Sequence, residues 1–139
     1  MNDENKRKHL EFIQLVITRM NVNSFLVKGW TITIISALFA LAAVNSDRGF
    51  VILGLFPAIV FWFLDAYYLR QERLYRHLYD NVRGKDEGAI DYQMDATNFT
   101  KEDNTNYFKT LLSLTLCIFY LSLIIIIVFM MKFIKNLAS

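Results

Sequence analysis

Long apolar runs alternate with polar segments along this chain of 139 residues. The purest run, Leu111–Met131, holds 21 consecutive residues without a charged side chain. A helix rises about 1.5 Å per residue, so a run of this length crosses the roughly 30 Å hydrocarbon core of a bilayer. A chain this short has no core large enough to bury such a helix on every side. The pattern therefore predicts that this helix lies in lipid.

Two further runs of 20 residues predict two further spans. Phe25–Val44 contains one charged residue, Lys28, and Phe50–Leu69 contains one, Asp65. Three hydroxyl residues dilute the first run, and such side chains can bond back onto a helix backbone in lipid: Thr31, Thr33 and Ser36. The first 24 residues lack the apolar core and cleavage site of a signal peptide, so we expect them to be retained. The pattern predicts an all-α membrane protein with three transmembrane helices.

The distribution of Lys and Arg predicts the orientation of these helices. Four basic residues precede the first span, one lies in the turn at 45–49, seven lie in the loop 70–109 and two lie in the tail. The orientation that keeps most positive charge inside has a cytoplasmic N-terminus, a cytoplasmic loop and a C-terminus outside. The two Lys residues of the tail run against this rule for the third span.

Apolar residues recur at helical spacing before the first span and after the second. The first stripe comprises Leu10, Ile13, Ile17 and Met20, and the second comprises Leu74, Tyr75, Leu78, Tyr79 and Val82. The first stripe packs on a neighbouring helix or lies on the lipid surface, and Gly84 is a natural helix stop. We expect two antiparallel cytoplasmic extensions that make residues 1–84 one long helical hairpin, with stripes that meet each other or other copies.

Residues 85–107 have a different composition, with six acidic and two basic side chains. We interpret this segment as an acidic cytoplasmic connector, followed at 108–139 by the third span and a short tail. The connector either stays a solvated linker or folds back onto the basic residues before it and competes with an anion for them.

Asp65 is the first candidate for a functional role, because a carboxylate within a span is costly and is usually paired or faces water. Lys28 lies 17 residues before Asn45, and Asp65 lies 16 residues after Gly49. In an antiparallel hairpin the two residues lie at nearly the same depth, which predicts an ion pair at the inner boundary. The alternative is that Asp65 extends to water and Lys28 to lipid headgroups.

Four residues of the first helix are candidates to line a water-filled path that favours anions: Arg19, Lys28, Thr33 and Ser36. The alternative is that the hydroxyl residues only pack helices together. Pro57, the single proline, removes a helix hydrogen bond and predicts a bend. The bend is either a fixed feature that accommodates packing or the hinge of a gate.

Five basic residues follow the second span and predict contact with anionic lipid or with a phosphate-bearing ligand: Arg70, Arg73, Arg76, Arg83 and Lys85. A net charge of +2 is too small to indicate nucleic acid, and we expect no stable binding of a duplex.

The sequence contains no pattern that indicates catalysis. It holds no phosphate-binding loop, nucleophile elbow or paired carboxylates, so we predict no enzyme and no cofactor. His9 and His77 are far apart and no Cys or carboxylate cluster joins them, so we predict no metal site. The single Cys117 lies in the third span, where we expect it to pack as a small apolar residue.

Four segments carry a resemblance to known proteins: KHLEFIQLVITRM, NSFLVKGW, SALFALAA and FWFLDAYYLRQERLYRHLYD. They resemble short bacterial inner-membrane proteins, similar to the SLATT-type two-span effectors and the Hailong-type channel subunit of antiphage defence. The similarity covers Lys8 to Arg83 and is one of layout and composition. It implies an oligomeric effector that permeabilises the bacterial inner membrane upon infection, with a nucleotide or oligonucleotide from a partner enzyme as a candidate gating ligand.

These features together predict an ion-conducting pore that favours anions. The pore must be a homo-oligomer, because the three helices of one copy are too few to enclose a water-filled path. The alternative is a non-conducting membrane adaptor that docks a cytosolic partner through its helical extensions. A transporter is disfavoured, since neither an inverted repeat nor a pair of broken helices is visible.

Overall fold

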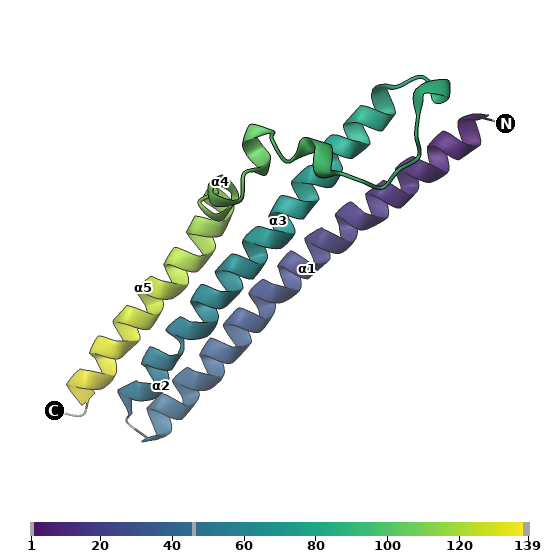
Figure 1. Cartoon of the computed structure of the whole chain (residues 1–139). Coiled ribbons are helices and arrows are strands. Elements are labelled where there is room, and N and C mark those ends of the chain that lie inside the picture. Colours follow the sequence, from purple (N-terminus) through teal and green to yellow (C-terminus); the bar gives the residue numbers. More distant parts are fainter. Residues whose placement is uncertain (1, 46, 138–139) are drawn as a thin grey trace. The chain divides into compact units, whose positions relative to one another are not determined.

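The computed structural model describes residues 2–45 and 47–137, and these residues form helices and loops without a strand among them. Three long helices make up most of the chain: α1 (Asn2–Asn45), α3 (Leu55–Gly84) and α5 (Leu114–Leu137) (Figure 1). The shorter elements are α2 (Arg48–Leu53), α4 (Tyr107–Leu111) and the 3-10 turns η1 (Glu87–Ala89), η2 (Thr97–Phe99) and η3 (Asp103–Thr105).

Three helical stretches are long and apolar enough to cross a membrane: Glu4–Asn45, Arg48–Gly84 and Leu114–Ile134. Within their most apolar windows, only 22%, 33% and 17% of the residues are buried inside the chain. The remaining apolar surface must face lipid or other protein, because exposing this much of it to water is unfavourable. The predicted all-α class is confirmed, with three helical stretches that are long and apolar enough to span a membrane.

The chain divides into two compact units, and both α1 and α3 contribute to each. The polar unit comprises Met1–Ser24 and Tyr67–Thr110, and the apolar unit comprises Phe25–Ala66 and Leu111–Ser139. The connector therefore belongs with the two helical extensions, and the third span belongs with the first two.

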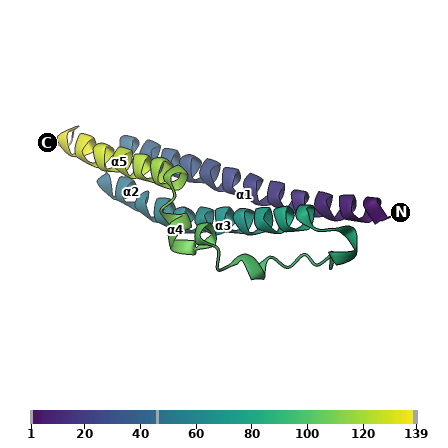
Figure 2. The ribbon, with the colours of Figure 1, turned by 90° about the horizontal axis from the view of Figure 1, so that it is seen from above.

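The two predicted stripes form most of the core of the polar unit. Its buried residues are Ile13, Ile17, Leu74, Leu78, Val82, Ile90 and Ala96. Since Ile90 and Ala96 come from the connector, this segment packs on the helices, and Figures 1 and 2 show it running back along α3. Of the two alternatives for the connector, folding back is the one that the structure contains.

The start of α1 and the end of α3 are joined by a charged side chain. The Lys6 ammonium donates hydrogen bonds to the carbonyl oxygens of Lys85, at 2.8 Å, and Arg83, at 3.2 Å. The last carbonyls of a helix lack partners within it and carry partial negative charge, so a cation is favourable there. This contact holds the two extensions antiparallel at their far end.

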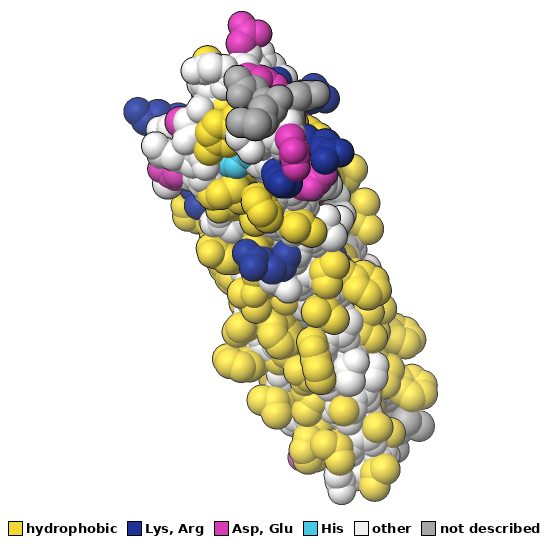
Figure 3. Space-filling view, turned by 90° about the vertical axis from the view of Figure 1, so that its right-hand side faces the viewer, with side chains coloured by type: hydrophobic (Ala, Val, Ile, Leu, Met, Phe, Trp, Pro, Cys, Tyr) yellow, Lys and Arg dark blue, Asp and Glu magenta, His cyan; other side chains and the backbone are white. Residues whose placement is uncertain are grey.

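The core of the apolar unit is formed by residues of α1, α2, α3 and α5: Ile35, Ala42, Val51, Ala58, Ile127 and Ile134. The small side chains of Ala42 and Ala58 allow helices to approach closely, which is how spanning helices associate in lipid. The outer surface of this unit is covered with hydrophobic side chains, as Figure 3 shows for one face.

A break divides the second span into α2 and α3, and it lies next to the single proline. The ring of Pro57 has no N–H to donate to the carbonyl of Leu53, four residues earlier, so the helix stops at Leu53. The helix resumes at Leu55, and Gly54 forms the turn between, its N–H donating to the carbonyl of Val51 at 3.1 Å. The structure thus contains a break in the helix beside Pro57, whereas the bend and its action as a gate hinge stay predictions.

Candidate functional site

One residue from each long helix enters a buried polar cluster within the apolar unit. Lys28 Nζ of α1 lies 2.6 Å from Asp65 Oδ2 of α3. Tyr120 Oη of α5 lies 3.1 Å from the same oxygen and donates a hydrogen bond to it. Asp65 and Tyr120 are fully buried, whereas the Lys28 side chain is 22% exposed. The predicted ion pair is confirmed, and Tyr120 is a third member that sequence reasoning missed.

Backbone and side-chain groups surround the Tyr120 hydroxyl. Tyr120 Oη also lies 3.1 Å from the carbonyl oxygen of Phe61, one turn before Asp65, so two acceptors share its proton. The buried hydroxyl of Thr31 donates to the carbonyl of Val27 at 2.7 Å and also interacts with Tyr120. These contacts satisfy polar groups that would be costly to bury alone in lipid.

Aromatic rings enclose the cluster. The rings of Trp62 and Tyr120 are stacked, with centroids 5.7 Å apart and planes 5° from parallel. Lys28 Nζ lies 5.9 Å from the centroid of Phe119, at which distance the negative face of a ring attracts a cation. These apolar rings lower the polarity around the pair, which strengthens the attraction between Lys28 and Asp65.

Trp62 also explains how the third span is fixed beside the cluster. Between α4 and α5 the helix is interrupted at residues 112–113, so the carbonyl of Leu111 is released from helical bonding. The indole N–H of Trp62 donates to this carbonyl at 3.0 Å. The same side chain therefore stacks on Tyr120 and satisfies the helix end that precedes it.

The cluster has a clear electrostatic consequence for ion conduction. The positive charge of Lys28 is neutralised by a carboxylate at contact distance, and the pair is held in place by a third helix. Lys28 is therefore a structural cation that joins two spans, and an anion preference requires a contribution from other basic residues such as Arg19.

The other pore candidates lie on the surface of the chain. Arg19, Thr33 and Ser36 are exposed, and the Thr33 hydroxyl donates to the carbonyl of Gly29 at 2.9 Å. A shallow groove of about 350 Å³ runs past Thr33, lined also by Phe25, Leu26, Gly29 and Trp30. The structure thus places Thr33 and Ser36 apart from the Lys28–Asp65 pair, on the outside of α1.

The five residues of the basic cluster have separate partners. Arg70 Nε donates to the carbonyl of Thr105 at 2.8 Å, and Arg73 Nη1 donates to the carbonyl of Asn104 at 2.8 Å. The remaining pairs are Arg76 with Glu72 at 2.7 Å and Arg83 with Asp80 at 3.4 Å, while the carbonyl of Lys85 accepts from Lys6. Arg70 and Arg73 therefore hold the connector, and the four Arg side chains have separate partners instead of converging on one phosphate-sized site.

The described parts of the chain contain no group of three or more His, Cys, Asp or Glu residues that could hold a metal ion. No protein-family model, curated protein or solved structure matches this chain.

Proposed function

We propose that this chain assembles with copies of itself into an ion-conducting pore in a bacterial inner membrane. The observation that carries the proposal is a face of α1 in the apolar unit that exposes small and hydroxyl-bearing side chains. Its members are Gly29, Thr33, Ser36, Ala37 and Ala40, all exposed and spaced to share one side of a helix. Spanning helices that face only lipid gain nothing from such residues, whereas helices that approach one another closely require them.

A pore between copies follows from the packing of a single copy. The centre of the apolar unit is filled by its hydrophobic core and by the Lys28–Asp65–Tyr120 cluster, so a water path must lie between protomers. In the closed pore this α1 face packs against another copy, and when the gate opens its hydroxyl groups, those of Thr33 and Ser36, line the water-filled path. The exposed cation Arg19 is the remaining support on α1 for an anion preference.

The proposal includes an orientation and a role. The excess of Lys and Arg supports a cytoplasmic N-terminus and connector and a periplasmic C-terminus. The resemblance to SLATT-type and Hailong-type effectors supports a gated pore that depolarises the membrane in antiphage defence, and the helix break beside Pro57 is the candidate hinge of its gate.

Reconstitution in liposomes with an ion-sensitive dye tests the proposal. We expect flux from the wild-type protein and loss of both flux and oligomer size in Gly29→Leu, because a large side chain blocks close approach of α1. The matched control is Ile125→Leu, which retains an apolar side chain at an exposed position of α5. Intact oligomers that conduct no ion under any trigger would end the proposal.

A non-conducting adaptor is the competing function, and the folded connector favours it. Because the connector packs on the helices, its exposed carboxylates Asp91 and Asp95 form an ordered surface suited to a basic partner. Overexpression separates the two functions. A pore arrests growth and depolarises the cell, whereas an adaptor is harmless when overproduced and loses its partner in Asp91→Asn.

A further inference from the structure

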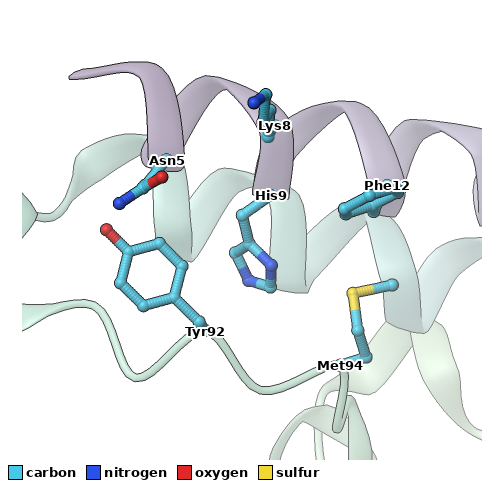
Figure 4. A pocket seen from close by; sticks show the side chains of 6 residues that line it. All are labelled: Asn5, Lys8, His9, Phe12, Tyr92 and Met94. Atoms are coloured by element: carbon cyan, nitrogen blue, oxygen red, sulfur yellow. The ribbon is translucent and has the colours of Figure 1, made fainter. Parts of the chain in front are cut away.

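A cleft of about 360 Å³ lies in the polar unit between α1 and the connector (Figure 4). Six residues line it: Asn5, Lys8, His9, Phe12, Tyr92 and Met94. Figure 4 shows His9 pointing from α1 toward the connector, with the ring of Tyr92 on one side and Met94 on the other. None of these residues belongs to the Lys28–Asp65 pair or to the proposed pore lining.

His9 is the unusual feature of this cleft. The residue is 95% buried, yet its Nε2 has no hydrogen-bond partner among the residues that the structure describes. Buried polar atoms are nearly always bonded, so an orphaned one needs an explanation. The ring of Tyr92 lies against the imidazole, with centroids 5.5 Å apart and planes at 68°. Tyr92 also has a φ of 56°, a left-handed conformation that bulky residues rarely adopt.

The side chains that line the cleft indicate which kind of ligand it can bind. Phe12, Tyr92 and Met94 provide an apolar wall, on which a planar ring can stack and contact a thioether sulfur. Asn5 and Lys8 can donate hydrogen bonds, and so can His9 when its Nε2 carries a proton. None of the described residues that line the cleft carries a carboxylate. The lining therefore combines a site for an aromatic ring with donors for an anion.

We propose that this cleft binds a small aromatic carboxylate, with the ring on Phe12 and Met94 and the carboxylate accepting a hydrogen bond from His9 Nε2. The exposed ring of Tyr92 turns aside to admit the ligand, because in the present structure Nε2 is shielded from solvent. Lys8 pairs with Glu4 at 2.9 Å on the surface, and this weak exposed contact can be exchanged for the ligand. A phosphate dianion suits the cleft less well, because no Arg lines it.

Methyl NMR on the full-length protein in lipid nanodiscs tests the proposal, with indole-3-acetate as the probe. The methionine methyls are ¹³C-labelled, and the Met94 signal is assigned with Met94→Leu. We expect a saturable shift of this signal in the wild type. Binding should weaken at least tenfold in His9→Leu, which fills a similar space with an apolar side chain that has no donor. It should be unchanged in Leu15→Ala, at an exposed α1 position outside the cleft.

Two control ligands separate the ring from the anion. Indole-3-ethanol has the same ring without the carboxylate, and acetate has the carboxylate without the ring, so both should bind at least tenfold more weakly. Phe12→Ala removes an exposed wall of the cleft and should weaken binding even if His9→Leu fails to fold. The proposal is overturned by the lack of a saturable Met94 shift, by equal binding of the neutral analogue, or by undiminished binding in Phe12→Ala.

Discussion

Lys28 Nζ and Asp65 Oδ2 are 2.6 Å apart, and the two residues belong to different spanning helices. Asp65 is fully buried, and the ammonium of Lys28 lies beside its carboxylate as the counter-charge within an apolar unit. Tyr120 extends the contact to the third span. A single carboxylate thus joins all three spanning helices.

Removing the cation should destabilise the protein strongly. Lys28→Met leaves Asp65 buried without a counter-charge, and breaking a buried pair in this way costs about 3 kcal/mol or more. Exchanging the two residues, with Lys28→Asp and Asp65→Lys together, should recover a large part of the loss. Thermal unfolding in nanodiscs measures both. The exposed pair Arg83–Asp80 is the control, since Arg83→Ala should cost only about 0.5 kcal/mol. An exchange variant no more stable than either single variant contradicts the stabilising role of the pair.

Tyr120→Phe isolates the contribution of one hydroxyl group. The ring and its stacking on Trp62 remain, while Asp65 loses a hydrogen bond but keeps Lys28. We expect a loss of about 1–2 kcal/mol in the free energy of unfolding. Tyr67→Phe, at an exposed position of α3, should change stability little. Because the three side chains form one network, the loss should be non-additive with that of Lys28→Met, and strict additivity would show that they act separately.

The helix break at Gly54 should depend on Pro57. Pro57→Ala supplies an N–H that can donate to the carbonyl of Leu53, which allows α2 and α3 to join into one helix. Hydrogen exchange of the amides at 55–58 should slow as a result. Pro57→Gly provides the same N–H without the helix preference of Ala and should slow exchange less. Unchanged exchange in Pro57→Ala would assign the break to Gly54. A change in ion flux in the same variant would support the hinge.

Hydrophobic pattern and turn length were sufficient to predict one pair of helices in detail. The turn between the first two spans is so short that the number of residues from it to Lys28 and to Asp65 fixes the relative depth of these two side chains. The apolar stripes of the two extensions meet for the same reason. Tyr120 was not predictable in this way. A connector of more than twenty residues precedes its helix, so the sequence leaves the vertical position and rotation of α5 against the hairpin undetermined.

The packing of the connector was also not visible in the sequence. Its composition is acidic and polar, and the few apolar residues that anchor it, Ile90 and Ala96, have no regular spacing. The cleft at His9 depends on this packing, because two of its lining residues, Tyr92 and Met94, come from the connector. In the sequence His9 is a single histidine beside an apolar stripe. Nothing marks it as part of a cleft until the position of the connector is known.

Arg73 should hold the connector in place. Its Nη1 donates to the carbonyl of Asn104 at 2.8 Å and lies 3.2 Å from the Thr110 hydroxyl. Arg73→Ala removes these bonds, so we expect faster hydrogen exchange and easier proteolysis near residues 104–110, with the helices unaffected. Arg76→Ala is the matched control, because Arg76 pairs with Glu72 on its own helix. Equal protection of the connector in both variants would show that its hydrophobic anchors suffice.

The carboxylate of Asp95 should titrate at lower pH than an ordinary aspartate. It accepts hydrogen bonds from the Thr97 backbone N–H, at 2.8 Å, and from the Thr97 hydroxyl, at 2.9 Å, and these bonds favour the charged form and lower the pKa of Asp95. Since the folded pKa lies below the unfolded one, the stabilisation is fully present above the unfolded pKa and is lost as pH falls through the folded pKa.

Thr97→Val removes the hydroxyl but keeps the backbone N–H, so the pKa of Asp95 should rise only part of the way toward that of an ordinary aspartate, as followed by carboxyl ¹³C NMR. Thr100→Val is the control, because the Thr100 hydroxyl donates to a carbonyl instead. An Asp95 pKa that is the same in Thr97→Val and in the wild type would mean that the backbone bond alone sets it.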